Sequence, residues 1–81
     1  MTEEIWSEID ALSEEIAAAQ QKILLQCGRR LVPHLTDEDL LQPNDFPELE
    51  NHPHFRYEEG ILAGIYTLQM ALRALKNKSL R

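Results

Sequence analysis

The sequence predicts an all-α protein, an antiparallel helical hairpin with a long structured acidic loop that dimerises into a four-helix bundle. Two observations favour this fold class. Two long stretches carry apolar residues three and four positions apart, which is the spacing of one helix face. The segment between them holds prolines and short apolar runs. With 81 residues, the chain is expected to form a single domain, residues 1–81.

The first helix is predicted over residues 3 to about 32. Thr2 can cap it, and the carboxylates of Glu3 and Glu4 favour a helix N-terminus. Pro33 ends it, because the residue before a proline resists helical geometry. Its apolar positions alternate four and three apart, close to coiled-coil spacing: Ile5, Ile9, Leu12, Ile16, Ala19 and Ile23.

The loop, residues 33–52, is predicted to contain short helical turns. Thr36 with the acidic residues behind it indicates a capped short helix that Pro43 ends. Asp45 and Pro47 indicate a second turn. The loop is too apolar for a free linker. We expect its apolar residues to fold over the open end of the hairpin, with some left exposed as a docking surface.

The second helix is predicted over residues 53 to about 77. Pro53 suits the first helical turn, where its missing N–H costs nothing. Acidic residues lie early in this helix and basic residues lie late, which favours the helix dipole. The apolar face of this helix is formed by Ile61, Ile65, Leu68, Leu72 and Leu75.

Small residues suggest where the two helices approach each other. Gly60 and Gly64 share a helix face, and counting back from the turn puts an alanine run within about one turn of Gly64. We therefore expect close helix packing among Ala18, Ala19, Gly60 and Gly64. The alternative is that both glycines face water.

Charges favour the antiparallel direction. It would place Glu3, Glu4 and Glu8 beside Arg73, Lys76 and Lys78, and Arg29 and Arg30 beside Glu58 and Glu59. Exposed ion pairs contribute little to stability, so this charge pattern is evidence for the relative direction of the helices and not for a stable contact.

Composition narrows the function classes. The net charge of −6 disfavours nucleic-acid binding, and the lone Cys27 allows no internal disulfide, which fits a reducing cytoplasm. The first ten residues lack the basic and apolar regions of a secretory signal. Acidic residues precede the apolar run of the second helix, and Gln69 and Arg73 interrupt that run, so no membrane span is expected. We expect a cytoplasmic protein.

No catalytic, metal or cofactor site is expected. His34, His52, His54 and Cys27 do not have the spacing of zinc ligands. Glu58 and Glu59 lie beside arginines in a first helical turn, where a salt-bridge group is expected rather than acid–base chemistry.

The first functional hypothesis is a small protein–protein interaction module, such as an adaptor, small chaperone or regulatory subunit. A chain this short buries little of its apolar surface and is marginally stable alone. A second copy would cover more of that surface, so a homodimer is expected. Candidate contacts with a partner are Trp6, Leu40, Leu41, Phe46 and Tyr57. The alternative hypothesis is a small helical-bundle enzyme or anion-binding protein that uses Arg29, Arg30 and Arg56 near the loop.

The run Ile9-Asp10-Ala11-Leu12-Ser13-Glu14-Glu15-Ile16 resembles the opening helix of the all-helical chorismate mutases. Those enzymes are intertwined helical dimers that bind a dicarboxylate with several arginines. This chain has Trp6 and Ile23 where that helix would carry its catalytic arginines, and it has no third long helix. We therefore assign no family.

Overall fold

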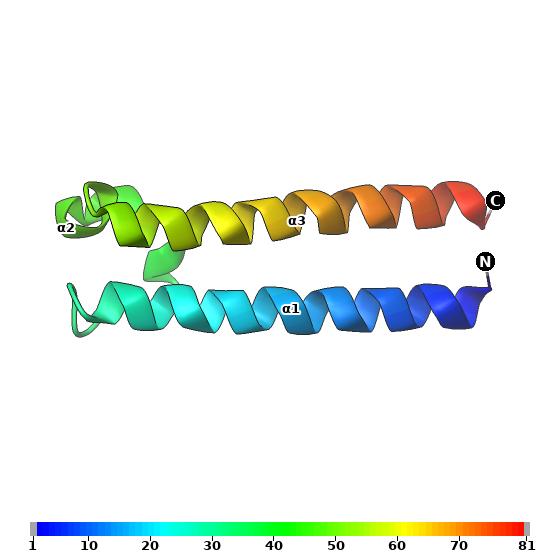
Figure 1. Ribbon diagram of the computed structural model, residues 1–81, viewed down its shortest axis with the longest axis horizontal. Coiled ribbons are helices and arrows are strands. Elements are labelled where there is room, and N and C mark those ends of the chain that lie inside the picture. Colours follow the sequence, from blue (N-terminus) through cyan, green and yellow to red (C-terminus); the bar gives the residue numbers. More distant parts are fainter. Residues whose placement is uncertain (1, 81) are drawn as a thin grey trace.

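The all-α class is confirmed by the computed structural model, which describes residues 2–80. The elements are α1 (Glu3–Arg29), η1 (Asp39–Leu41), η2 (Pro43–Asp45), α2 (Pro47–Glu50) and α3 (Pro53–Ser79), where η denotes a 3₁₀ turn. The two long helices lie side by side and run in opposite directions, with the start of α1 beside the end of α3 (Figure 1). The molecule is a rod with extents of 46 × 19 × 16 Å.

Local hydrogen bonds set the ends of the long helices. Thr2 caps α1, because its hydroxyl accepts from the Ile5 N–H at 3.2 Å. The helix ends at Arg29, short of the predicted end near residue 32. There the Gly28 carbonyl accepts from two backbone N–H groups, and the chain turns. At α3 the cap is His52, whose Nδ1 accepts from the Phe55 N–H at 3.4 Å.

The connecting segment folds over one end of the helix pair. Thr36 and Asp39 bond reciprocally, backbone N–H to side-chain oxygen, at 3.0 and 3.2 Å, which starts the turn at η1. Leu35 and Leu49 from this segment are fully buried. The predicted folding of apolar loop residues onto the end of the helices is thus confirmed for these two leucines.

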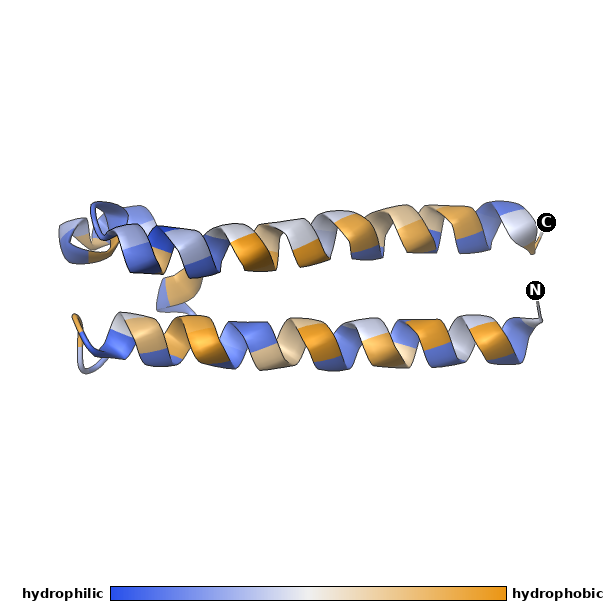
Figure 2. Ribbon diagram, viewed as in Figure 1, coloured by the Kyte–Doolittle hydropathy of each residue, from blue (hydrophilic) through white to orange (hydrophobic). Residues whose placement is uncertain are grey.

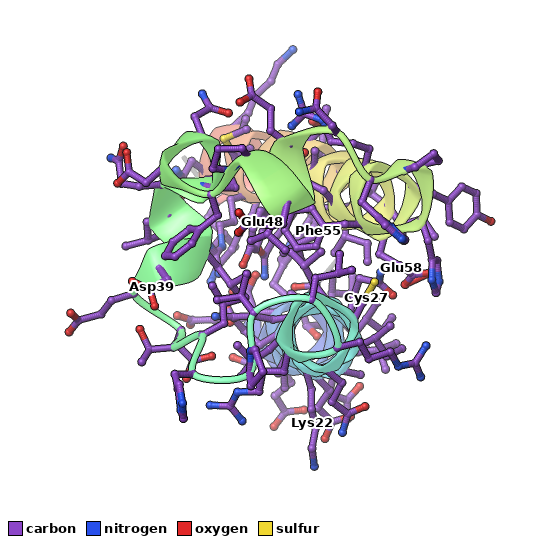
Figure 3. All side chains as sticks on the ribbon, turned by 90° about the vertical axis from the view of Figure 1, so that its left-hand side faces the viewer. Lys22, Cys27, Asp39, Glu48, Phe55 and Glu58 are labelled. Carbon is purple, nitrogen blue, oxygen red and sulfur yellow. The ribbon has the colours of Figure 1, made fainter. Side chains whose placement is uncertain are left out.

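The apolar core lies at the loop end, between the helices and under the connecting segment (Figure 3). It consists of Leu24, Cys27, Leu35, Leu49, Phe55 and Leu62. Gly28 borders this core so closely that a Cβ there would lie 2.5 Å from Leu35 Cδ2 and 3.4 Å from Phe55 Cε2. The glycine that close packing requires is therefore Gly28.

Away from this core, polar residues hold α1 against α3. The Gln20 amide Nε2 donates to the Glu58 carbonyl oxygen at 3.1 Å and to Glu58 Oε2 at 2.8 Å. The Gln69 amide donates to Ser13 Oγ at 3.1 Å and Glu14 Oε1 at 3.0 Å. We call the whole line of contact between α1 and α3, core residues included, the seam. On α1 it contains Trp6, Ser13, Ala17, Gln20, Leu24 and Cys27; on α3 it contains Phe55, Leu62, Gln69 and Lys76.

Ion pairs complete the seam toward the chain ends. Lys76 Nζ lies 2.8 Å from Asp10 Oδ2, and Arg73 pairs with Glu14. The basic end of α3 thus meets acidic residues of α1, which is the direction that the charge pattern predicts. The partners differ from the predicted Glu3, Glu4 and Glu8, because Asp10 and Glu14 are closer to the line of contact.

Trp6 closes the seam near the chain ends. It is only 2% exposed, and its indole Nε1 has no hydrogen-bond partner within residues 2–80. A buried donor without a partner costs about 1–3 kcal/mol. Packing of the large ring offsets that cost, because a buried tryptophan removes extensive apolar area from water.

The seam predicts a measurable effect of Gln20→Ala. The substitution removes both bonds from the amide to Glu58, so we expect the free energy of unfolding to fall by about 1 kcal/mol. The matched control is Gln26→Ala on the exposed surface of the same helix, for which we expect no loss. Urea titrations of the two variants would measure this difference, and equal stabilities would show that the seam contributes nothing.

Candidate interaction surface

An apolar surface runs along one side of the helix pair, beside the seam. We call it the apolar side. It consists of Ile5, Ile9, Leu12, Ile16 and Ile23 on α1 and Ile61, Ile65, Leu68, Leu72 and Leu75 on α3. None of these side chains is buried. Figure 2 shows hydrophobic segments recurring along both long helices.

The positions of these residues in the sequence explain why they do not lie between the helices. Most of them directly precede a seam residue: Leu12 precedes Ser13, Ile16 precedes Ala17, and Leu68 precedes Gln69. Successive residues of an α-helix are about 100° apart. Each stripe is therefore turned roughly a quarter of a revolution away from the seam.

Both stripes turn to the same side of the molecule. Two antiparallel helices that face one another are related by a two-fold axis perpendicular to the plane through both helices. The apolar stripe of each helix is turned by about the same angle, in the same sense, from its seam residues. The two-fold axis therefore brings both stripes to the same side of the plane. Figure 3 agrees, because Cys27 and Glu58 lie together on the side opposite Asp39 of η1. Ile23 lies one turn before Cys27, and Ile61 lies about one turn after Glu58.

The exposed area of the molecule is large for its mass. The chain exposes 5864 Å², whereas a folded monomer of 9.4 kDa exposes about 5,000 Å². The surplus of roughly 850 Å² is similar to what each partner contributes to a protein–protein interface of standard size.

The predicted packing of small residues is wrong within the chain. A Cβ built at Gly60 or Gly64 meets no atom within 4 Å, and Ala18 and Ala19 are exposed. Ala17 is the alanine that lies in the seam. The physical reason is that Gln20 and Gln69 face the opposite helix, and this rotation turns the neighbouring alanines and the two glycines outward.

The predicted partner contacts have different surroundings. Trp6 is buried in the seam, while Leu40 and Phe46 are half-buried against the core. Leu41 and Tyr57 are exposed. Leu40 and Leu41 also line a shallow groove of about 190 Å³ between η1 and the long helices, on the side opposite the apolar side.

The three candidate anion-binding arginines have separate roles. Arg29 Nε donates to the Leu35 carbonyl oxygen at 2.8 Å, which holds the turn after α1. Arg56 pairs with Glu59 at 2.8 Å on the surface of α3. Arg30 is exposed near Cys27. Two of the three guanidinium groups thus have partners in the chain, and nothing in the geometry directs the three toward one anion.

The histidines and the cysteine were considered as metal ligands and, for Cys27, as a nucleophile. No group of three or more histidine, cysteine or acidic side chains suited to a metal ion occurs within residues 2–80. His52 caps α3. Burial raises the pKa of the Cys27 thiol above its ordinary value; nearby Arg30 lowers it and Glu58 raises it further. A buried thiol with a raised pKa is a poor nucleophile.

Among the described residues, no helix combines the length and apolar character needed to cross a bilayer.

Sequence reasoning missed the seam. Its signal is a seven-residue repeat on each helix: Trp6, Ser13, Gln20 and Cys27 on α1, and Phe55, Leu62, Gln69 and Lys76 on α3. The repeat mixes aromatic, aliphatic and polar residues, so a search for apolar periodicity passes over it.

Comparison of the chain with protein-family models, curated proteins and solved structures gives no significant match.

Proposed function

We propose that this chain is a small protein–protein interaction module that acts through its apolar side and pairs there with a second copy of itself. The observation that carries the proposal is the continuous apolar side, which both long helices form and the connecting segment leaves uncovered. The proposal assigns no catalysis.

The chemistry of the two faces supports this reading. The seam, which the chain already covers, places two amides and a lysine among its apolar residues, and these polar groups bond to carboxylates beside it. The ten aliphatic residues of the apolar side are left partly or fully exposed. Burying apolar area contributes about 25 cal/mol per Å², so association gains most where these residues meet a matching surface.

A second copy is the occupant that fits best. The apolar side is nearly as long as the rod, and another copy offers the same length, width and apolar character. Two helix pairs joined in this way form a four-helix bundle, in which the apolar residues of all four helices become the core. A self-complementary patch of this kind is typical of two-fold symmetric dimers.

Leu68→Glu and Met70→Glu together test the proposal. These residues are 62% and 63% exposed and lie on opposite sides of Gln69, so only Leu68 belongs to the apolar side. We expect the unaltered chain to sediment as a dimer at micromolar concentration. Leu68→Glu should convert it to a monomer, because a carboxylate buried without a partner is costly. Met70→Glu should leave the dimer intact.

Two results would contradict the proposal. A monomer of the unaltered chain at high micromolar concentration would remove self-association. Equal sedimentation of both variants would show that the apolar side is not the contact. Circular dichroism spectra of both variants would verify that each remains helical.

A further inference from the structure

We infer that, in the dimer, α1 of each copy packs against α3 of the other, with the two-fold axis parallel to the long helices. The inference rests on the proposed self-association and adds its geometry. Both chain ends of both copies would then lie at one end of the bundle, and both connecting segments would lie at the other end.

Two arrangements bring one apolar side against another. In the first, each α1 lies against α3 of the other copy. In the second, the copies are reversed end to end, so that α1 lies against α1 and α3 against α3. Both give a bundle in which every neighbouring helix is antiparallel. The choice between them depends on which residues lie at the same height along the rod.

The seam shows which residues of α1 and α3 lie at the same height. Gln20 bonds to Glu58, Ser13 to Gln69 and Asp10 to Lys76. Two antiparallel α-helices rise equally per residue, so positions of equal height fall one residue lower on α3 for each residue gained on α1. The Ser13–Gln69 bond, the middle one of the three, sets the match between the two helices. By this relation, Ala19 lies at about the height of Gly64, and Ile23 lies at about the height of Ile61.

Side-chain size favours α1 against α3 of the other copy. Ala19 and Gly64 lie at the outer edges of the apolar side, next to Ile23 and Leu68 respectively. In the first arrangement, Ala19 of one copy faces Gly64 of the other, so the helices can approach closely at mid-length, twice in the dimer. Gly64 has no atom within 4 Å of a Cβ position in the single chain, so it is free to make that contact.

Charge favours the same arrangement. Glu8 and Glu15 are exposed at the outer edge of α1. On α3, the facing edge from Gly64 to Leu75 carries no acidic residue, and Lys78 follows it. In the reversed arrangement the midpoint of α1 lies near Ile16, so Glu15 of one copy faces Glu15 of the other. Like charges placed together across an interface disfavour that pairing.

The arrangement also decides what the dimer presents to other molecules. The groove beside η1 lies opposite the apolar side, so it stays exposed on both copies. The two grooves then lie on opposite outer faces at the same end of the bundle.

Disulfide trapping between single-cysteine variants tests the inference. In a Cys27→Ala background, Ile23→Cys and Ile61→Cys are made on separate chains, mixed, and oxidised. We expect a disulfide-linked heterodimer on a non-reducing gel, because these positions face each other across the proposed interface at helix-packing distance. The control is Ile16→Cys alone, which should not cross-link, since the two α1 helices would be diagonal.

Each outcome has a definite meaning when sedimentation is measured on the same samples. A dimer in which the mixture cross-links and Ile16→Cys does not supports the inference. A dimer in which Ile16→Cys cross-links, or in which the mixture does not, overturns the inference and leaves the proposed function standing. A monomeric Cys27→Ala chain, with a monomeric unaltered chain beside it, overturns both. A second background, Cys27→Ser, guards against a folding defect specific to alanine.

Discussion

Phe55→Ala is expected to lower the free energy of unfolding by about 3–5 kcal/mol. Phe55 is fully buried where both long helices and the connecting segment meet. Removing the ring leaves a cavity beside Leu35 and Leu49 that the surrounding residues cannot close. A chain of this size has a total stability of about 4–12 kcal/mol, so much of its helicity should be lost at 37 °C.

Thermal melts followed by circular dichroism would measure the effect of Phe55→Ala. The matched control is Tyr57→Ala, two positions later on the same helix, where the side chain is 67% exposed. We expect the control to change the stability by less than about 0.5 kcal/mol. The proposed self-association would make the melting temperature depend on protein concentration, so the variants must be compared at one concentration. Similar losses for the two variants would show that the loop-end core is not the main source of stability.

Gly28→Val is expected to destabilise the chain by about 1–3 kcal/mol through overpacking. A Cβ at this position would lie 2.5 Å from Leu35 Cδ2, and Leu35 has no free space into which to move because it is fully buried. The valine methyl groups would also approach Phe55 and Leu49. The better helix propensity of valine compared with glycine offsets only a few tenths of a kcal/mol.

Gly60→Val is the matched control for Gly28→Val, because the same side chain is added within a helix where no atom lies within 4 Å. We expect its stability to equal or slightly exceed that of the unaltered chain. Urea titrations of both variants would give the comparison. If Gly60→Val were the more damaging substitution, the close approach would lie at the outer glycines and not at the loop-end core.

Much of the fold could be predicted from local signals. Thr2 and Pro53 mark the starts of the two long helices because their effects act within one turn of the chain. The end of α1 at Arg29 lies ahead of the end that Pro33 predicts. The leucines of the connecting segment indicated that it folds back, because so apolar a linker does not remain free in water. The order of charges indicated the relative direction of the helices, although the observed pairs use Asp10 and Glu14.

The rotation of the helices about their own axes could not be predicted in the same way. Apolar stripes normally indicate the contact face, but here the contact within the chain is the seam, which mixes polar and apolar residues. Gln20 and Gln69 can face inward only because Glu58, Ser13 and Glu14 lie at the right height to accept from them. Such a match depends on a residue of the other helix, so neither helix shows it alone. The close approach at Gly28 is likewise hidden from the helix patterns, because its nearest neighbour is Leu35 of the connecting segment.

The amides of Gln20 and Gln69 also set the register of α1 against α3. Two helices with purely apolar contact faces can shift by one turn along their axes with little loss of stability, since one leucine replaces another. Here a slip by one turn would break the bonds from Gln20 to Glu58 and from Gln69 to Ser13 and Glu14. These bonds favour one register of α1 against α3 in the single chain. The residues that both helices expose therefore keep the same relative positions for any molecule that binds them.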